Sequence, residues 1–125
     1  MANNTETGMN EKLGLPFGKM ERVAICFDVD GTLINEYDEN PVTTNLLSAF
    51  TLQKWKNLDV IVWSGGGKQY AETMFREYVS NDTSKVKFYS KLQLGELQAR
   101  YAKIIAIDDI QDTAIGDVNL IVRNK

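Results

Sequence analysis

Residues Val23–Leu33 read VAICFDVDGTL, and this stretch is the most informative part of the chain. Its first half is a continuous apolar run, which is typical of a strand covered on both faces of a parallel sheet. Two carboxylates follow at Asp28 and Asp30, and the chain then turns at Gly31. Carboxylates at the exit of a buried strand are costly unless a positive charge meets them. The stretch therefore indicates a metal site, phosphate chemistry or both.

Further apolar runs predict the rest of a sheet. Val60–Trp63, Ile104–Ile107 and Leu120–Val122 are continuous and predict strands covered on both faces, whereas the mixed segment Val86–Tyr89 predicts an edge strand. Between them lie three amphipathic segments, whose apolar residues recur at helical spacing. Strands that alternate with helices predict a doubly wound, Rossmann-like α/β fold with a mainly parallel five-stranded sheet. The predicted helical core stripes are Leu46, Leu47 and Phe50, with a cap at Thr43 or Thr44; Tyr70, Met74 and Tyr78; and Leu94, Leu97 and Tyr101.

Length and composition are those of one globular domain. The chain has 125 residues, of which 43% are hydrophobic. Residues 1–20 are polar and predict a flexible leader, so residues 21–125 would form the single domain. No apolar run approaches the roughly 20 residues of a membrane span, and the first ten residues lack the apolar region of a signal peptide. We expect a cytoplasmic protein.

Missing residue types exclude several chemistries. The chain has no histidine, which excludes Ser-His-Asp and Cys-His catalysis within one chain. Cys26 is its only cysteine, so there is no internal disulfide and no cysteine-rich zinc cluster. The net charge is −3 and no basic block stands out, which argues against sequence-independent binding to nucleic acid. Any chemistry at the site must therefore come from carboxylates, lysines, hydroxyls, backbone amides and a hard cation.

Polar residues follow four of the predicted strands. Ligands of parallel α/β sheets bind at the carboxyl ends of the strands, so these residues would converge. Nearby carboxylates cannot all ionise without a counter-charge, and Mg²⁺ suits them because it takes oxygen ligands and binds carboxylates together with a phosphate. Lys91 would add positive charge, and Ser64 with the glycine-rich turn from Gly65 would form an anion cradle. The converging carboxylates are Asp28, Asp30, Asp108 and Asp109.

On these motifs the chain resembles the haloacid dehalogenase superfamily, and within it the Mg²⁺-dependent aspartyl-phosphate phosphatases. The resemblance spans Val23 to Val122. Asp28–Leu33 matches the first motif and Ser64 the second. Lys91 fits the third, with Lys85 and Lys87 as alternatives. Asp108 and Asp109, with Asp112, fit the fourth, which more commonly reads Gly-Asp.

The resemblance implies a role for each matched residue. Asp28 would attack phosphorus and carry the phosphoryl group, while Asp30 would protonate the leaving oxygen and then deprotonate the attacking water. An acid at position 30 favours a phosphatase over a dehalogenase or a P-type ATPase. The implied Mg²⁺ ligands are the Asp28 carboxylate, the Asp30 main-chain carbonyl and Asp109, supported by Asp108, with the choice between Asp108 and Asp109 left open. The implied phosphate-binding residues are Ser64, Gly65 and Lys91.

A cap domain, which many family members insert over the site, is not expected here. Ile34–Asn40 leaves room only for a hairpin, and Ser80–Ser84 only for a loop. An open site predicts either a macromolecular substrate or a small phosphomonoester under the lid of a neighbouring subunit in a homo-oligomer. Tyr37 and Tyr70 are candidate substrate contacts, although core packing is the preferred interpretation of Tyr70.

Two other functions stay open. A catalytically silent member of the same fold would act as a binding module. A phospho-accepting receiver domain has a similar length, an acidic cluster, a hydroxyl and a lysine. However, a receiver places its acid pair after the first strand and its acceptor aspartate after the third, the reverse of the order here. The turn Gly65–Lys68 also lacks the spacing of a nucleotide-binding P-loop.

Overall fold

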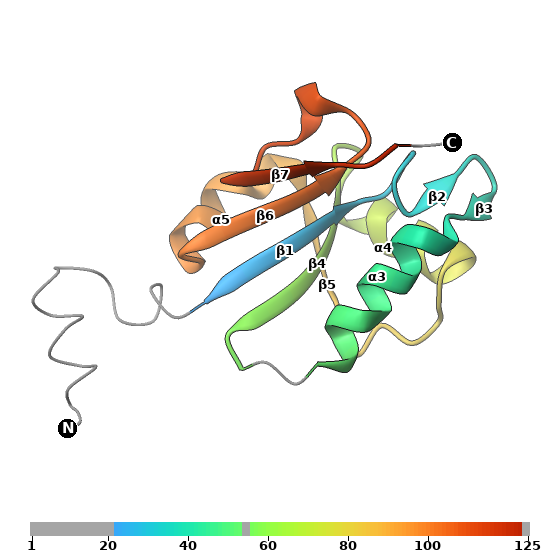
Figure 1. Ribbon diagram of the computed structural model, residues 1–125, viewed down its shortest axis with the longest axis horizontal. Helices are drawn as coiled ribbons and strands as arrows, with labels where there is room; N and C mark the ends of the chain where they lie inside the picture. Colours follow the sequence, from blue (N-terminus) through green and yellow to red (C-terminus); the bar gives the residue numbers. More distant parts are fainter. Residues whose placement is uncertain (1–21, 54–55, 124–125) are drawn as a thin grey trace, which may run out of the picture.

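Five parallel strands form the centre of the molecule, a computed structural model that describes residues 22–53 and 56–123. The predicted leader lies outside these residues. The sheet order is β5-β4-β1-β6-β7, which is 3-2-1-4-5 when its strands are counted along the chain, as in Rossmann-like sheets (Figure 1). The predicted doubly wound α/β fold is therefore confirmed. The strands are β1 (Val23–Asp28), β4 (Leu58–Ser64), β5 (Lys87–Ser90), β6 (Lys103–Asp108) and β7 (Val118–Ile121).

Helices cover both faces of this sheet (Figure 1). Helices α3 (Pro41–Leu52) and α4 (Lys68–Tyr78) lie on one face, where Leu47 and Phe75 pack with Phe27 of β1. Helix α5 (Leu94–Arg100) lies on the other face, where Leu97 packs with Trp63 of β4. Among the described helices, none has the length and apolar character that crossing a bilayer requires.

The central strand β1 supplies both cores. Its alternate residues belong to opposite faces, with Phe27 under α3 and α4 and Cys26 under α5. Cys26 pairs with Ile61 of β4 on one side and with Ala106 of β6 on the other. This two-sided burial explains the continuous apolar run, and it brings Asp28, the last residue of the strand, to the carboxyl edge of the sheet.

The helix cap predicted at Thr43 or Thr44 is wrong, because α3 starts earlier. Asn40 is the N-cap, and its side chain accepts a hydrogen bond from the Val42 amide at 3.1 Å. Pro41 then occupies the first helical turn, where its missing amide hydrogen costs nothing. Both threonines are buried inside the helix instead, and the hydroxyl of Thr44 donates to the Asn40 carbonyl at 2.9 Å.

Two predictions of burial are also wrong. Leu46 is 38% exposed, so it lies outside the core stripe of α3. All four residues of β7 are exposed, although the run Leu120–Val122 predicted a strand covered on both faces. Strand β7 is an edge strand that pairs only with β6 in the described sheet, and the connection before it holds the short 3₁₀ helix η2 (Gln111–Thr113) rather than an α-helix.

The two segments considered for an inserted cap are short. Residues 29–40 contain turns and the antiparallel hairpin of β2 (Ile34–Asn35) and β3 (Asp38–Glu39). Residues 79–86 connect α4 to β5 without a helix or strand. Neither segment carries a cap domain, as predicted, and the predicted edge position of β5 is confirmed.

Candidate active site

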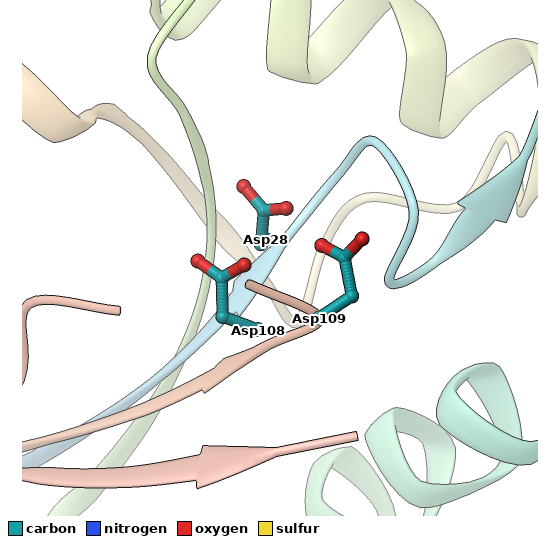
Figure 2. Close-up of side chains that lie close together, drawn as sticks. All are labelled: Asp28, Asp108 and Asp109. Carbon is teal, nitrogen blue, oxygen red and sulfur yellow. The ribbon is translucent and has the colours of Figure 1, made fainter. Parts of the chain in front are cut away.

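Three carboxylates meet at the carboxyl edge of the sheet. Asp28 ends β1, Asp108 ends β6, and Asp109 follows directly. One oxygen from each side chain lies within 4.8 Å of the others. Figure 2 shows the three carboxyl groups on the same side of the strand ends. We call Asp28, Asp108 and Asp109 the carboxylate cluster. The sequence predicted a fourth member, Asp30, whose side chain instead bonds to α4, as described below.

Lys91 is the cation of this cluster. Its Nζ lies 3.0 Å from Oδ1 of Asp28 and 2.7 Å from Oδ2 of Asp108. It also donates to the main-chain carbonyl of Thr113 at 3.1 Å. The Lys91 side chain is only 11% exposed. Burial lowers its pKa, but the hydrogen bonds to Asp108 and Asp28 outweigh burial and raise it, so Lys91 is charged.

Local structure holds Lys91 in place. Ser90 caps the 3₁₀ helix η1 (Lys91–Gln93). Its hydroxyl accepts a hydrogen bond from the Leu92 amide, and the side-chain oxygen of Gln93 accepts one from the Ser90 amide. The Lys91 ammonium also lies 5.9 Å from the centre of the Trp63 ring, within range of a cation–π contact. The Lys91 backbone is therefore held in a capped turn, and its ammonium lies over the buried indole ring of Trp63.

The alternative lysines lie elsewhere. Lys87, at the start of β5, makes an ion pair with Asp59 at 3.1 Å. Lys85 is exposed in the loop before β5 and lines a groove with Thr51 and Leu52 at the end of α3. Of the three candidate lysines, Lys91 alone contacts the carboxylate cluster in the described contacts.

Asp108 is held by protein donors. It is 1% exposed and accepts hydrogen bonds from Lys91, from the Ile110 amide at 3.0 Å and from the Thr113 hydroxyl at 3.1 Å. Burial raises the pKa of Asp108, but these bonds and the Lys91 charge more than offset it, so the pKa is lowered overall. Asp108 is therefore a stable anion that fixes Lys91.

Asp109 lies against the turn that follows β1. Its Oδ1 accepts from the Thr32 hydroxyl at 3.2 Å. Gly31 has φ +80°, and a Cβ atom there would lie 2.2 Å from Oδ2 of Asp109. Burial and the neighbouring Asp108 raise the pKa of Asp109. Asp109 thus has a fixed position but weaker charge compensation than Asp108.

Asp28 is the buried centre of the cluster. Its carboxylate accepts from the Thr32 hydroxyl at 3.3 Å and pairs with Lys91. Burial raises its pKa to about 6, Lys91 opposes this shift, and the charges of Asp108 and Asp109 add to it. The cluster contains three carboxylates and one ammonium, which leaves an excess of two negative charges when all are ionised. An oxygen-binding divalent cation would balance that excess.

The glycine-rich turn after β4 is suited to an anion. Ser64 is buried at the strand end and accepts from the Gly66 amide at 2.9 Å, while Gly65 is exposed beside it. Helix α4 then starts at Lys68 with Gly67 as its N-cap and without a side-chain cap. The first amides of a helix lack intrahelical partners, so an uncapped N-terminus attracts anions.

Asp30 is exposed and bonds to α4. The Tyr70 hydroxyl lies 2.8 Å from its Oδ1 and 3.1 Å from its Oδ2. The hydrogen bond to Asp30 raises the pKa of Tyr70, which keeps the hydroxyl protonated. Tyr70 is 37% exposed, so the preferred prediction that it packs in the core is wrong.

The remaining candidates lie at the periphery. Tyr37 is 78% exposed on the hairpin, and Asp112 is exposed on η2 outside the carboxylate cluster. Thr32 and Thr113 were not assigned a role from the sequence, although each donates to a clustered carboxylate. The position of Thr32, directly after Asp-x-Asp-Gly, could have indicated its contact with the cluster. Nothing in the sequence around Thr113 indicates its contact with Asp108.

A scan against protein-family models and a search of the curated proteins find no match to this chain. The site is suited to bind a metal ion and an anion side by side. The excess negative charge of its buried carboxylates suits the metal ion, and the lysine and the uncapped helix N-terminus suit the anion.

Proposed function

We propose that this protein is a Mg²⁺-dependent phosphomonoester hydrolase of the haloacid dehalogenase type, acting through an aspartyl-phosphate intermediate. The observation that carries the proposal is the placement of Asp28. Its Oδ1 lies 3.0 Å from the Lys91 ammonium, beside two further carboxylates and at the same sheet edge as the turn after Ser64. The proposed nucleophile, the proposed phosphate-binding cation and the proposed anion-binding turn therefore lie at one edge of the sheet.

The donor set fits Mg²⁺. Only oxygen ligands are offered, and their charge exceeds that of Lys91. Asp28, Asp109 and the main-chain carbonyl of Asp30 would hold the ion, which when bound neutralises charge on the phosphoryl oxygens. Asp108, whose oxygens already accept from Lys91 and other donors, would support the site without being its main ligand.

The residues divide the reaction into two steps. A carboxylate oxygen of Asp28 bonds to phosphorus, the bond from phosphorus to the leaving oxygen breaks, and Asp30 gives that oxygen a proton. Water then attacks phosphorus and loses a proton to Asp30, and the bond from phosphorus to Asp28 breaks to release phosphate. Lys91, Ser64 and the amides from Gly65 onward would bind the phosphoryl oxygens in both steps.

The strand order argues against the receiver alternative. Receiver domains have the order 2-1-3-4-5, whereas the sheet here has the order 3-2-1-4-5. The catalytically silent binding module remains the competing function. It would use the same anion and metal sites without turnover.

We infer the substrate class from the short segments beside the site. Without a cap, the protein would act on a large phosphorylated substrate, or on a small one covered by a neighbouring subunit in a homo-oligomer. The exposed Tyr37 is the proposed substrate contact on the hairpin. We also propose that the reaction takes place in the cytoplasm.

The test is an aryl phosphate assay with Mg²⁺ and with EDTA. Wild type should turn over only with Mg²⁺, and Asp28→Asn should lower kcat by about 1,000-fold or more, because the nucleophile is lost. Asp82→Asn, in the exposed loop before β5, is the matched control and should keep full activity. Turnover in EDTA would contradict the metal requirement. Mg²⁺ binding without turnover of any phosphomonoester would favour the binding module.

A further inference from the structure

The contact between Tyr70 and Asp30 joins two segments that are 40 residues apart. The hydroxyl lies within hydrogen-bond distance of both carboxylate oxygens, at 2.8 and 3.1 Å. Asp30 comes from the turn after β1, and Tyr70 from the first turn of α4. Among the hydrogen bonds of the described residues, Tyr70 is the donor to the Asp30 side chain.

Tyr70 is itself held in place. Its ring lies over the glycine-rich turn, and a Cβ atom at Gly66 would come 3.2 Å from Cδ2 of the ring. The absence of a side chain at Gly66 therefore allows the Tyr70 ring to pack closely against the turn. The same turn holds Ser64, whose hydroxyl accepts from the Gly66 amide at 2.9 Å. The tyrosine thus connects the position of Asp30 to the proposed phosphate-binding turn.

Asp30 needs such a partner. It is exposed, and it lies two residues from the buried Asp28, beside a cluster with excess negative charge. An exposed carboxylate next to like charges tends to rotate away from them into solvent. A hydroxyl donor can fix one orientation, and a hydrogen bond to a charged group contributes more than one between neutral groups.

We infer that Tyr70 is the positioning residue for Asp30, and this rests on the proposed function. The tyrosine proton stays on its oxygen throughout. When Asp30 is protonated, its O–H bond breaks and the leaving oxygen gains that proton, while Tyr70 donates to the other carboxyl oxygen. When Asp30 is ionised, the same hydroxyl donates to the carboxylate, so one oxygen stays directed at the reacting group in both steps.

The experiment compares two substrates in wild type, Tyr70→Phe and Tyr78→Phe. Tyr78 lies two turns further along α4 and packs against the core. Tyr78→Phe is therefore the matched control, because it also removes a tyrosine hydroxyl from α4. The measured quantity is kcat/KM with Mg²⁺ for an alkyl and an aryl phosphate. An alkyl oxide leaves poorly without a proton, whereas an aryl oxide leaves readily, so a misplaced acid affects the alkyl substrate more.

Tyr70→Phe should lower kcat/KM about tenfold on the alkyl phosphate and less than about threefold on the aryl phosphate. Tyr78→Phe should match wild type on both. In an Asp30→Asn background, Tyr70→Phe should have no further effect, because the group that it positions is already lost.

Equal losses on the two substrates, or an additive loss in the Asp30→Asn background, would overturn the inference and assign Tyr70 another role. Unchanged rates of Tyr70→Phe beside an active wild type would overturn the inference alone. An inactive wild type would overturn both the inference and the proposed function.

Discussion

Gly31 and Asp109 approach so closely that a Cβ atom on residue 31 would lie 2.2 Å from Oδ2 of Asp109. The glycine also has φ +80°, a conformation that side chains with a Cβ atom rarely adopt. Gly31 lies in the turn after β1, Asp109 directly follows β6, and these two strands are neighbours in the sheet. The turn after β1 and Asp109 of the carboxylate cluster are therefore packed against each other.

Gly31→Ala should damage both stability and metal binding. The left-handed conformation alone costs about 1–2 kcal/mol for a residue with a Cβ atom, and Asp109 must also move. We expect a lower free energy of unfolding in urea and a weaker Mg²⁺-dependent rise in melting temperature. Gly95→Ala, where a Cβ atom meets nothing within 4 Å, is the control and should retain both properties. A Gly31→Ala protein that responds to Mg²⁺ as wild type does would contradict the packing argument.

Lys91→Met should destabilise the protein in a pH-dependent way. Loss of the ammonium leaves Asp28 and Asp108 buried without their cation, which costs about 3–5 kcal/mol near neutral pH. At lower pH the unpaired carboxylates take up protons in the folded state, so the loss should shrink. Urea unfolding at several pH values measures both effects. Lys87→Met removes a half-exposed ion pair and should cost less than about 1 kcal/mol; equal losses would contradict the account of Lys91.

Asp28→Asn should stabilise the metal-free protein above about pH 6. Burial raises the pKa of Asp28 from 3.8 to about 6, so the folded protein binds this proton more tightly than the unfolded chain does. The contribution of Asp28 to stability therefore falls as pH rises from about 4 to about 6. Asparagine resembles the protonated acid and stays neutral, so it avoids that loss.

The measurement is the free energy of unfolding in EDTA from acid to neutral pH. The two proteins should be equally stable near pH 4, and Asp28→Asn should gain up to about 3 kcal/mol above pH 6. Groups that do not interact with Asp28 titrate alike in both proteins, so the pH dependence of the difference reports Asp28 together with its direct partners. A difference that does not change with pH would show that burial does not control this carboxyl group.

The buried strands could be predicted from the sequence because their environment is repeated along the chain. Strand β1 has neighbours on both edges and helices on both faces, so every position from Ala24 to Phe27 is apolar. The same reasoning wrongly predicted burial of the strand at Leu120, because an apolar run does not reveal whether a helix covers the strand. The start of α3 was missed because Asn40 and the two threonines are all good caps, and only the fold selects among them.

The site was predictable as far as strand ends determine it. Asp28, Ser64 and Asp108 end strands and Lys91 follows one, so the parallel sheet brings all four to one edge. The orientation of Asp30 was not predictable. It depends on a hydroxyl 40 residues away, and the spacing of Asp28 and Asp30 contains no information about that contact.

The proposed mechanism requires a covalent bond between Asp28 and phosphorus, and this bond can be trapped. In Asp30→Asn an aryl phosphate can still transfer its phosphoryl group, since the aryl oxide leaves without a proton, but hydrolysis of the intermediate loses its base. After reaction with Mg²⁺ and an acid quench, peptide mass spectrometry should find one phosphoryl group on Asp28, and none when Asp28→Asn is added. A phosphoryl group on another residue, or its persistence in the double variant, would contradict the account.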